Sequence, residues 1–172
     1  GVPEGQGKQY DKTGTLVYEG DFVSGLREGF GKLYYGSKAH RDWYGECYRF
    51  WYTGIFRSGF LNGQGQGFYP NGKLEYEGEF VDSLPKGKGR WYRENGALVY
   101  EGDFDKGVPN GQGRWYYSNG ELEHEGEFEN GDPVGWGRRY YGNDTVWFEG
   151  VFNGWDCWEG KEYHNDGSYT VG

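Results

Sequence analysis

The residues of this 172-residue chain that most resemble metal ligands are two histidine–cysteine pairs. His40 and Cys47 lie seven residues apart, as do Cys157 and His164, and no Cys-x-x-Cys or His-x-x-x-His spacing accompanies them. Structural zinc sites draw four such ligands from short, regular spacings. We therefore expect no metal site in the chain and no cofactor.

Carboxylate pairs and glycine-rich segments are the next candidates for chemistry. A glycosidase needs one unique pair of acids whose pKa values are split by their surroundings. The glutamates here recur at one place in successive segments, as Glu77, Glu101 and Glu125 do, so none is singled out. The segment Gly111-Gln112-Gly113 lacks the following helix and the remaining residues of a phosphate-binding loop. The sequence thus predicts no catalytic residues and no enzyme.

Composition and charge exclude further classes. The chain holds 35 Gly, 8 Trp, 17 Tyr and 11 Phe, with a net charge of −9. A high charge with few aliphatic residues is typical of disorder, but disordered chains are poor in aromatic residues. The negative charge argues against nucleic acid as a partner and disfavours anionic membrane lipid. No apolar run approaches the roughly 18 residues of a membrane-spanning helix.

An internal repeat explains the composition. The segment Tyr76-Glu77-Gly78-Glu79-Phe80 recurs 24 residues later from Tyr100, then from His124 and from Phe148. Because His124 takes a tyrosine position, we expect it to be a packed ring. We interpret residues 1–172 as one repeat array, with a partial repeat at 1–17, repeats starting at 18, 52, 76, 100, 124 and 148, and an insertion within 36–51. Since Gly1 falls in mid-repeat, we expect a piece of a longer protein.

Within each repeat the pattern has a period of two, which is typical of β-strands. Tyr100 and Phe104 should face one side of a sheet, and Glu101 and Asp103 the other. An Asn-Gly pair such as Asn119-Gly120 is a strong hairpin signal. The predicted fold is all-β: a single-layer, twisted, open-ended antiparallel sheet of tandem β-hairpins with a period of about 24 residues.

Rows of like side chains should form the core of such a thin sheet. One row holds Phe22, Phe56, Phe80, Phe104, Phe128 and Phe152. A second row holds Tyr10, Tyr34, Phe68, Tyr92, Tyr116, Tyr140 and Tyr163. Regular glycines would let these rings lie close to the backbone.

Acidic and basic residues at two fixed positions of the repeat are present together or absent together. Glutamate at 19, 77, 101, 125 and 149 is followed, in most cases thirteen residues later, by Lys or Arg; where Thr53 replaces the acid, Gln66 replaces the base. We infer cross-strand pairing, whose main contribution is to the register of the strands.

The repeated Tyr-Glu-Gly-Asp/Glu-Phe, the following Gly-x-Gly and the closing Asn-Gly resemble the MORN (membrane occupation and recognition nexus) repeat over nearly the whole chain. The resemblance implies a grooved, non-catalytic sheet that acts as a cytoplasmic scaffold for other proteins. Some family members lie at the cytoskeleton or at membranes, so a scaffold that associates with membrane lipid is one alternative function.

Another resemblance leaves a different function class open. The segment 113–120, Gly-Arg-Trp-Tyr-Tyr-Ser-Asn-Gly, is similar to hairpins of extracellular choline-binding and related glycan-binding repeats. Those repeats hold small ligands in aromatic cages by cation–π contact or stacking. The period of 24 and the repeated Tyr-Glu-Gly-Glu-Phe favour the MORN interpretation.

The predicted partner is another protein whose basic amphipathic helix or extended segment lies in an aromatic groove. We expect this groove to be lined by Tyr92, Phe104, Tyr116, Phe128 and Tyr140. Secondary partner contacts are expected from Trp43, Trp51, Glu101, Asp103, Glu125 and Glu127, the two tryptophans because Trp and Tyr are common in interface hot spots. The unpaired terminal strands would support a homodimer.

Overall fold

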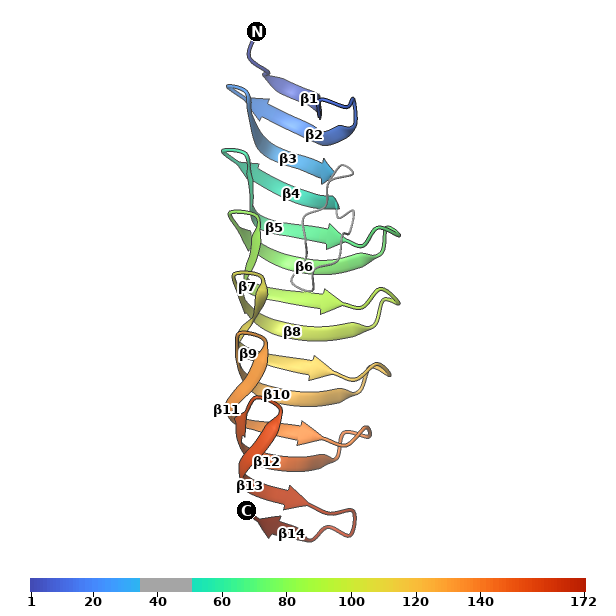
Figure 1. Cartoon of the computed structure of the whole chain (residues 1–172), viewed down its shortest axis with the longest axis vertical. Helices are drawn as coiled ribbons and strands as arrows, with labels where there is room; N and C mark the ends of the chain where they lie inside the picture. The colour runs from blue at the N-terminus through green and yellow to red at the C-terminus, as the bar shows by residue number, and fades with distance from the viewer. Residues whose placement is uncertain (35–50) are drawn as a thin grey trace. The chain divides into compact units, whose positions relative to one another are not determined.

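The computed structural model describes residues 1–34 and 51–172, and all regular structure in these ranges is β-strand. Consecutive strands pair antiparallel in the order of the chain, and the sheet is open, as predicted (Figure 1). The chain divides into two compact units, Gly1–Pro85 with Glu94–Gly96 and Lys86–Arg93 with Ala97–Gly172. In the described ranges, no helix long and apolar enough to cross a membrane is found.

The strands of each unit are regular in length. The first unit contains β1 (Gly5–Tyr10), β2 (Leu16–Val23), β3 (Leu26–Tyr34), β4 (Trp51–Arg57), β5 (Phe60–Phe68) and β6 (Leu74–Val81). Nearly all of β7 and the remaining strands belong to the second unit: β7 (Leu84–Tyr92), β8 (Leu98–Asp105), β9 (Val108–Tyr116), β10 (Leu122–Glu129), β11 (Asp132–Tyr140), β12 (Val146–Asn153), β13 (Asp156–Tyr163) and β14 (Tyr169–Val171).

Two kinds of tight turn connect the strands. Lys106 and Gly107 both have positive φ (50° and 91°), as the two central residues of a type I′ hairpin turn do. At the Asn-Gly sites only the glycine has positive φ, for example 90° at Gly120. Asn119 instead accepts a hydrogen bond from the Glu121 amide at 3.0 Å. The Asn-Gly pairs therefore mark turns as predicted, but the asparagine acts through its side chain.

A continuous row of glycines crosses the strands of each unit. In the second unit Gly102 lies opposite Gly113, and Gly113 lies opposite Gly126. The Tyr100 ring covers this row, so that a β-carbon at Gly102 would lie 2.6 Å from the tyrosine hydroxyl oxygen. That hydroxyl donates a 3.0 Å hydrogen bond to the Asp103 carbonyl. Glycine is thus required because the ring takes the space of a side chain.

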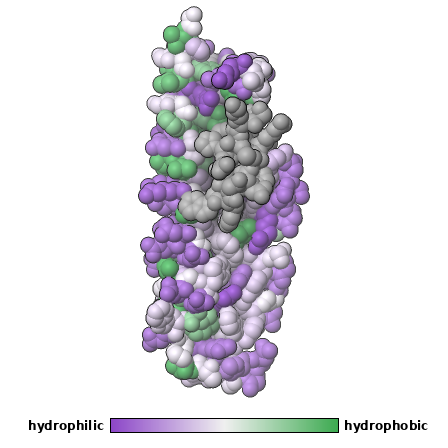
Figure 2. Space-filling model, in the orientation of Figure 1, coloured by the Kyte–Doolittle hydropathy of each residue, from purple (hydrophilic) through white to green (hydrophobic). Residues whose placement is uncertain are grey.

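The predicted phenylalanine row is confirmed as the core. Exposure of its members is between 0% and 6% at Phe22, Phe56, Phe80, Phe104, Phe128 and Phe152. Their rings contact the tyrosines edge-on, as in the 5.0 Å centroid separation between Tyr100 and Phe128. The surface of the second unit that Figure 2 shows is mainly hydrophilic or intermediate in hydropathy. Aromatic rings over glycine therefore replace an aliphatic core.

The sheet of each unit consequently has two different sides. We call the side that holds the phenylalanine row and the buried tyrosines Tyr18, Tyr76 and Tyr100 the aromatic face. We call the opposite side, represented by Glu101 and Arg114, the charged face. The predicted separation of Tyr100 and Phe104 from Glu101 and Asp103 agrees with burial of the rings and ion pairing of the acids.

Candidate functional site

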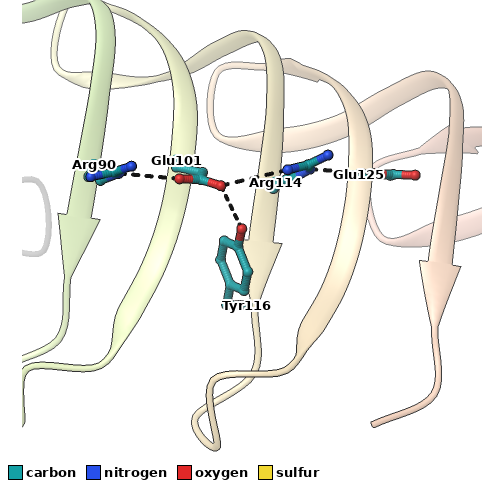
Figure 3. A network of polar contacts seen from close by, with 5 residues as sticks. All are labelled: Arg90, Glu101, Arg114, Tyr116 and Glu125. Atoms are coloured by element: carbon teal, nitrogen blue, oxygen red, sulfur yellow. Dashed lines mark hydrogen bonds and ion pairs between the residues drawn. The ribbon is translucent and has the colours of Figure 1, made fainter. Parts of the chain in front are cut away.

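An unbroken ladder of alternating bases and acids crosses the charged face of the second unit. Neighbours on adjacent strands are separated by 3.1–3.9 Å between nitrogen and oxygen, in the order Arg90, Glu101, Arg114, Glu125, Arg138 and Glu149. Figure 3 shows the part from Arg90 to Glu125. The predicted cross-strand pairing is confirmed here. The ladder's side chains are 28–57% exposed, so each ion pair by itself contributes little to the stability of the fold.

Tyrosine hydroxyls complete the hydrogen bonding of this ladder. Tyr116 donates to Glu101 at 2.7 Å, and Tyr140 donates to Glu125 at 2.6 Å. The Tyr116 hydrogen bond is the main cause that lowers the pKa of Glu101. Burial, reinforced by the glutamates, raises the pKa of Tyr116 and of Tyr140 to about 12. Both tyrosines therefore remain protonated donors at neutral pH.

The five residues expected to line one aromatic groove do not lie on one face. Phe104 and Phe128 are buried in the aromatic face, at 4% and 1% exposure. Tyr116 and Tyr140 lie on the charged face beside Glu101 and Glu125, and Tyr92 hydrogen-bonds with Arg90 of the same ladder. The predicted groove is therefore wrong in its composition. In the second strand of a hairpin the period of two places Tyr116 with Arg114, away from the glycines.

Tryptophans occupy the places on the aromatic face that the prediction gave to tyrosines. Trp115 contacts Trp91 at 6.1 Å and Trp155 at 5.5 Å between ring centroids. Its ring also stacks over buried Phe128 at 6.3 Å. All three tryptophans are partly exposed, and we call them the tryptophan strip. Counting in twos from Gly113 would have placed Trp115 on this face, so the signal was present in the sequence.

Next to the tryptophan strip lies a cluster around His124 and Arg139. The Arg139 guanidinium lies 5.2 Å from the Trp147 ring and 5.5 Å from the Trp155 ring, and donates to Glu123 at 3.1 Å. His124 is fully buried, as the prediction of a packed ring required, but neither ring nitrogen has a hydrogen-bond partner. Burial, with a smaller contribution from Arg139, lowers the pKa of His124 to about 4.

The predicted acidic contacts differ in their availability. Glu101 and Glu125 belong to the ladder, and Asp103 pairs with Lys88 at 2.8 Å. Glu127 is exposed. Of the predicted tryptophan contacts, Trp43 and the insertion lie outside the described residues. Trp51 begins β4, and its side chain is likewise outside the description. Among described residues, no group of three His, Cys, Asp or Glu side chains suits a metal ion.

Comparison with protein families gives matches along most of the chain. The model of the MORN repeat matches residues 18–39, 76–98, 100–121 and 124–146, and that of a MORN repeat variant matches residues 3–24 and 61–82. No curated protein matches the chain. MORN repeats are generally modules that bind proteins or membrane lipids, and the family is typically non-catalytic. With the MORN repeat model covering more than half of its residues, the chain belongs to the MORN repeat family.

Proposed function

We propose that the chain is a non-catalytic scaffold that binds a helix or extended segment of another protein on the aromatic face of its second unit. The observation that carries the proposal is the tryptophan strip, Trp91, Trp115 and Trp155. These rings contact one another while remaining partly exposed. Tryptophan is the residue type most enriched in interface hot spots, because it offers a large apolar area with few rotatable bonds.

The strip is supported from below by rigid structure. Trp115 lies over Tyr100 and Phe128, which are 0% and 1% exposed. A partner would therefore meet rings whose positions are already fixed, which reduces the entropy lost on binding. At the edge of the strip, Arg139 and Glu123 form a partly buried ion pair that can orient polar groups of a partner segment.

Charge favours a protein partner over membrane lipid. The chain carries a net charge of −9, which repels the anionic headgroups of cytoplasmic membranes. On the charged face of the second unit, the arginines Arg90, Arg114 and Arg138 are already paired with glutamates. This pairing leaves less positive charge for lipid phosphates.

The test is affinity capture from the native source, with partners identified by mass spectrometry and their binding then measured with purified components. Trp91→Ala and Trp115→Ala should each weaken binding at least about tenfold, since hot-spot truncations cost more than about 1.4 kcal/mol. The matched control is Trp158→Ala, a 69% exposed tryptophan of β13. Circular dichroism and thermal unfolding confirm that the variants are folded.

Three results would contradict the proposal. One is partner binding that survives both Trp91→Ala and Trp115→Ala. The second is saturable binding to phosphatidylserine vesicles that these variants abolish, which would indicate a lipid module. The third is saturable binding of choline or a glycan on the strip, which would restore the small-ligand alternative.

A further inference from the structure

A short row of side chains on the charged face of the second unit differs from the ladder beside it. The row crosses four neighbouring strands and consists of Glu127 on β10, Trp136 on β11, Val151 on β12 and Glu159 on β13. Trp136 lies opposite Val151, and Val151 lies opposite Glu159. Glu127 faces the bulge that contains Trp136. Its carboxylate oxygen lies 3.5 Å from the point where a β-carbon would stand if Gly135 were replaced by another residue. The order across the sheet is acid, aromatic, aliphatic, acid.

The centre of this row is apolar and open to solvent. Trp136 is 57% exposed and Val151 is 39% exposed. The Arg138 guanidinium lies 5.4 Å from the Trp136 ring, but its charge is already paired with Glu125 and Glu149. An exposed aromatic side chain therefore lies against an exposed valine on an otherwise polar face.

The two ends of the row carry exposed negative charge. Glu127 and Glu159 are both exposed, and within the described ranges neither carboxylate takes part in an ion pair or a hydrogen bond. The base closest in sequence to Glu159, Lys161, lies 5.2 Å from the Tyr169 ring. The row therefore presents one carboxylate on each side of an apolar centre.

The same row is polar and internally paired earlier in the second unit. There Lys88 on β7 lies opposite Asp103 on β8 and pairs with it at 2.8 Å. Asp103 also accepts a 3.1 Å hydrogen bond from the Gln112 amide on β9. The combination of an apolar pair with two unpaired acids in β10–β13 is thus not a general property of the repeat.

We infer that the row of Glu127, Trp136, Val151 and Glu159 is a docking site for a basic amphipathic helix of a partner protein. Three strand spacings separate the two acids, a distance of about 14 Å. Lysines at i and i+8 of an α-helix are about 12 Å apart along its axis, and an apolar residue at i+4 lies between them on the same face. The apolar residue meets Trp136 and Val151, and each lysine meets one carboxylate.

This site lies on the face opposite the tryptophan strip, and it does not rest on the function proposed above. The first unit supplies a matched comparison. Phe30 and Ile55 face each other at the corresponding place and are 56% and 38% exposed. Their flanking residues are Asp21, which accepts a hydrogen bond from Gln6, and the neutral Gln64. The geometry is similar there, but the two unpaired acids are missing.

The test uses the whole chain and a defined probe, a stapled helical peptide with Lys, Leu and Lys at i, i+4 and i+8. Binding is followed by titration calorimetry and by NMR shifts of the indole N–H groups at low salt. We expect the Trp136 indole to shift. The Glu127→Gln/Glu159→Gln variant should weaken binding about five- to tenfold, and Trp136→Ala about tenfold, whereas Phe30→Ala should change it less than about twofold.

The role of the two carboxylates and the location of the peptide on the charged face can be tested separately. Equal binding of a peptide with Glu in place of both lysines would remove the charge argument. The proposal would be overturned if the peptide bound Glu127→Gln/Glu159→Gln as tightly as the wild-type chain. It would also be overturned if the dissociation constant for the wild-type chain were above about 1 mM. Shifts confined to Trp91 and Trp115 would place the peptide on the tryptophan strip and likewise overturn it. Because all the substituted side chains are exposed, unchanged thermal unfolding should accompany each variant.

Discussion

The charge ladder is interrupted in the first unit and unbroken in the second, while the phenylalanine row is buried in both. In the second unit acids and bases alternate without a break from Arg90 to Glu149. In the first unit the corresponding positions run from Lys32 through Thr53 and Gln66 to Glu77. Thr53 even leaves its hydroxyl oxygen buried without a hydrogen-bond partner.

Strand register persists across this break. Gly31 still lies opposite Gly54, and Gly54 opposite Gly65, as glycines do in the second unit. Phe56 and Phe80 are 0% and 1% exposed, compared with 4% and 1% for Phe104 and Phe128. The glycine row and the rings above it therefore determine the register of the strands, and the ion pairs add to a register already fixed.

Removal of a core ring should have the largest effect and should be similar in both units. Phe56→Ala in the first unit and Phe128→Ala in the second should each lower the free energy of unfolding by about 3–5 kcal/mol, because each leaves a large cavity. Urea denaturation measures both values. A loss at Phe56 much smaller than that at Phe128 would show that the phenylalanine rows of the two units are not equivalent.

Acid should weaken the second unit through His124. Burial lowers the pKa of His124 to about 4, against 6.5 for an unburied histidine. The unfolded chain therefore binds the proton first, and stability is lost as the pH falls from above 6.5 toward 4. Between pH 7 and pH 5 the loss should be about 2 kcal/mol. Unfolding measured across this range, compared with His124→Tyr, isolates the contribution.

His124→Tyr should also introduce the hydrogen bond that the repeats starting at Tyr18, Tyr76 and Tyr100 have. Tyr100 donates from its hydroxyl to the Asp103 carbonyl at 3.0 Å, and a tyrosine at 124 has the Glu127 carbonyl at the corresponding place. The reverse substitution, Tyr100→His, should introduce acid sensitivity into an intact repeat. If the wild-type chain and His124→Tyr lose stability in parallel below pH 6.5, other groups cause the acid effect.

Breaking the ladder should have a modest effect that depends on the unit. Arg114→Gln removes the partner of Glu101 and Glu125 and should cost about 0.5–1 kcal/mol at low salt, and less in 1 M salt. Lys32→Gln, next to the neutral Thr53, should change the free energy of unfolding by a smaller amount. Equal costs for the two variants would mean that the unbroken ladder has no cooperative advantage.

Completing the ladder in the first unit should have the smallest effect. Thr53→Glu with Gln66→Arg would connect Lys32 to Glu77 through alternating charges. The double variant should gain about 0.5 kcal/mol over the sum of the single variants, as measured by a double-mutant cycle. A negative coupling energy would indicate that the geometry around Thr53 does not admit the pair.

Much of the fold could be predicted because the repeat makes each local pattern redundant. Alternation in Tyr100-Glu101-Gly102-Asp103-Phe104 placed its rings and acids on the correct faces, as their burial and pairing confirm. The turn at Asn119-Gly120 was also correctly placed, although Asn119 has no positive φ. Such features depend only on neighbours in the sequence.

The candidate site was harder to predict because it depends on the second strand of each hairpin. Three adjacent aromatic residues, Trp115, Tyr116 and Tyr117, follow Arg114. Their residue types alone do not show which of them contacts the core and which contacts the charged face. The structure places Trp115 over Phe128 and Tyr116 on Glu101, with a shift of register at the end of the strand. Only the neighbouring strands decide which aromatic ring is buried, exposed or hydrogen-bonded.

The repeat, the antiparallel hairpins, the phenylalanine core and the pairing of acids with bases all follow from the order of residues in the chain. Each is a periodic property, and the period of two in a strand converts spacing directly into a face. The contacts between strands required the folded structure: the tyrosines hydrogen-bond to the glutamates of the ladder, Trp115 meets Trp155, and Trp136 and Val151 meet between two unpaired acids. These arrangements join residues on different strands, and their contacts depend on register and bulges that side-chain type does not encode.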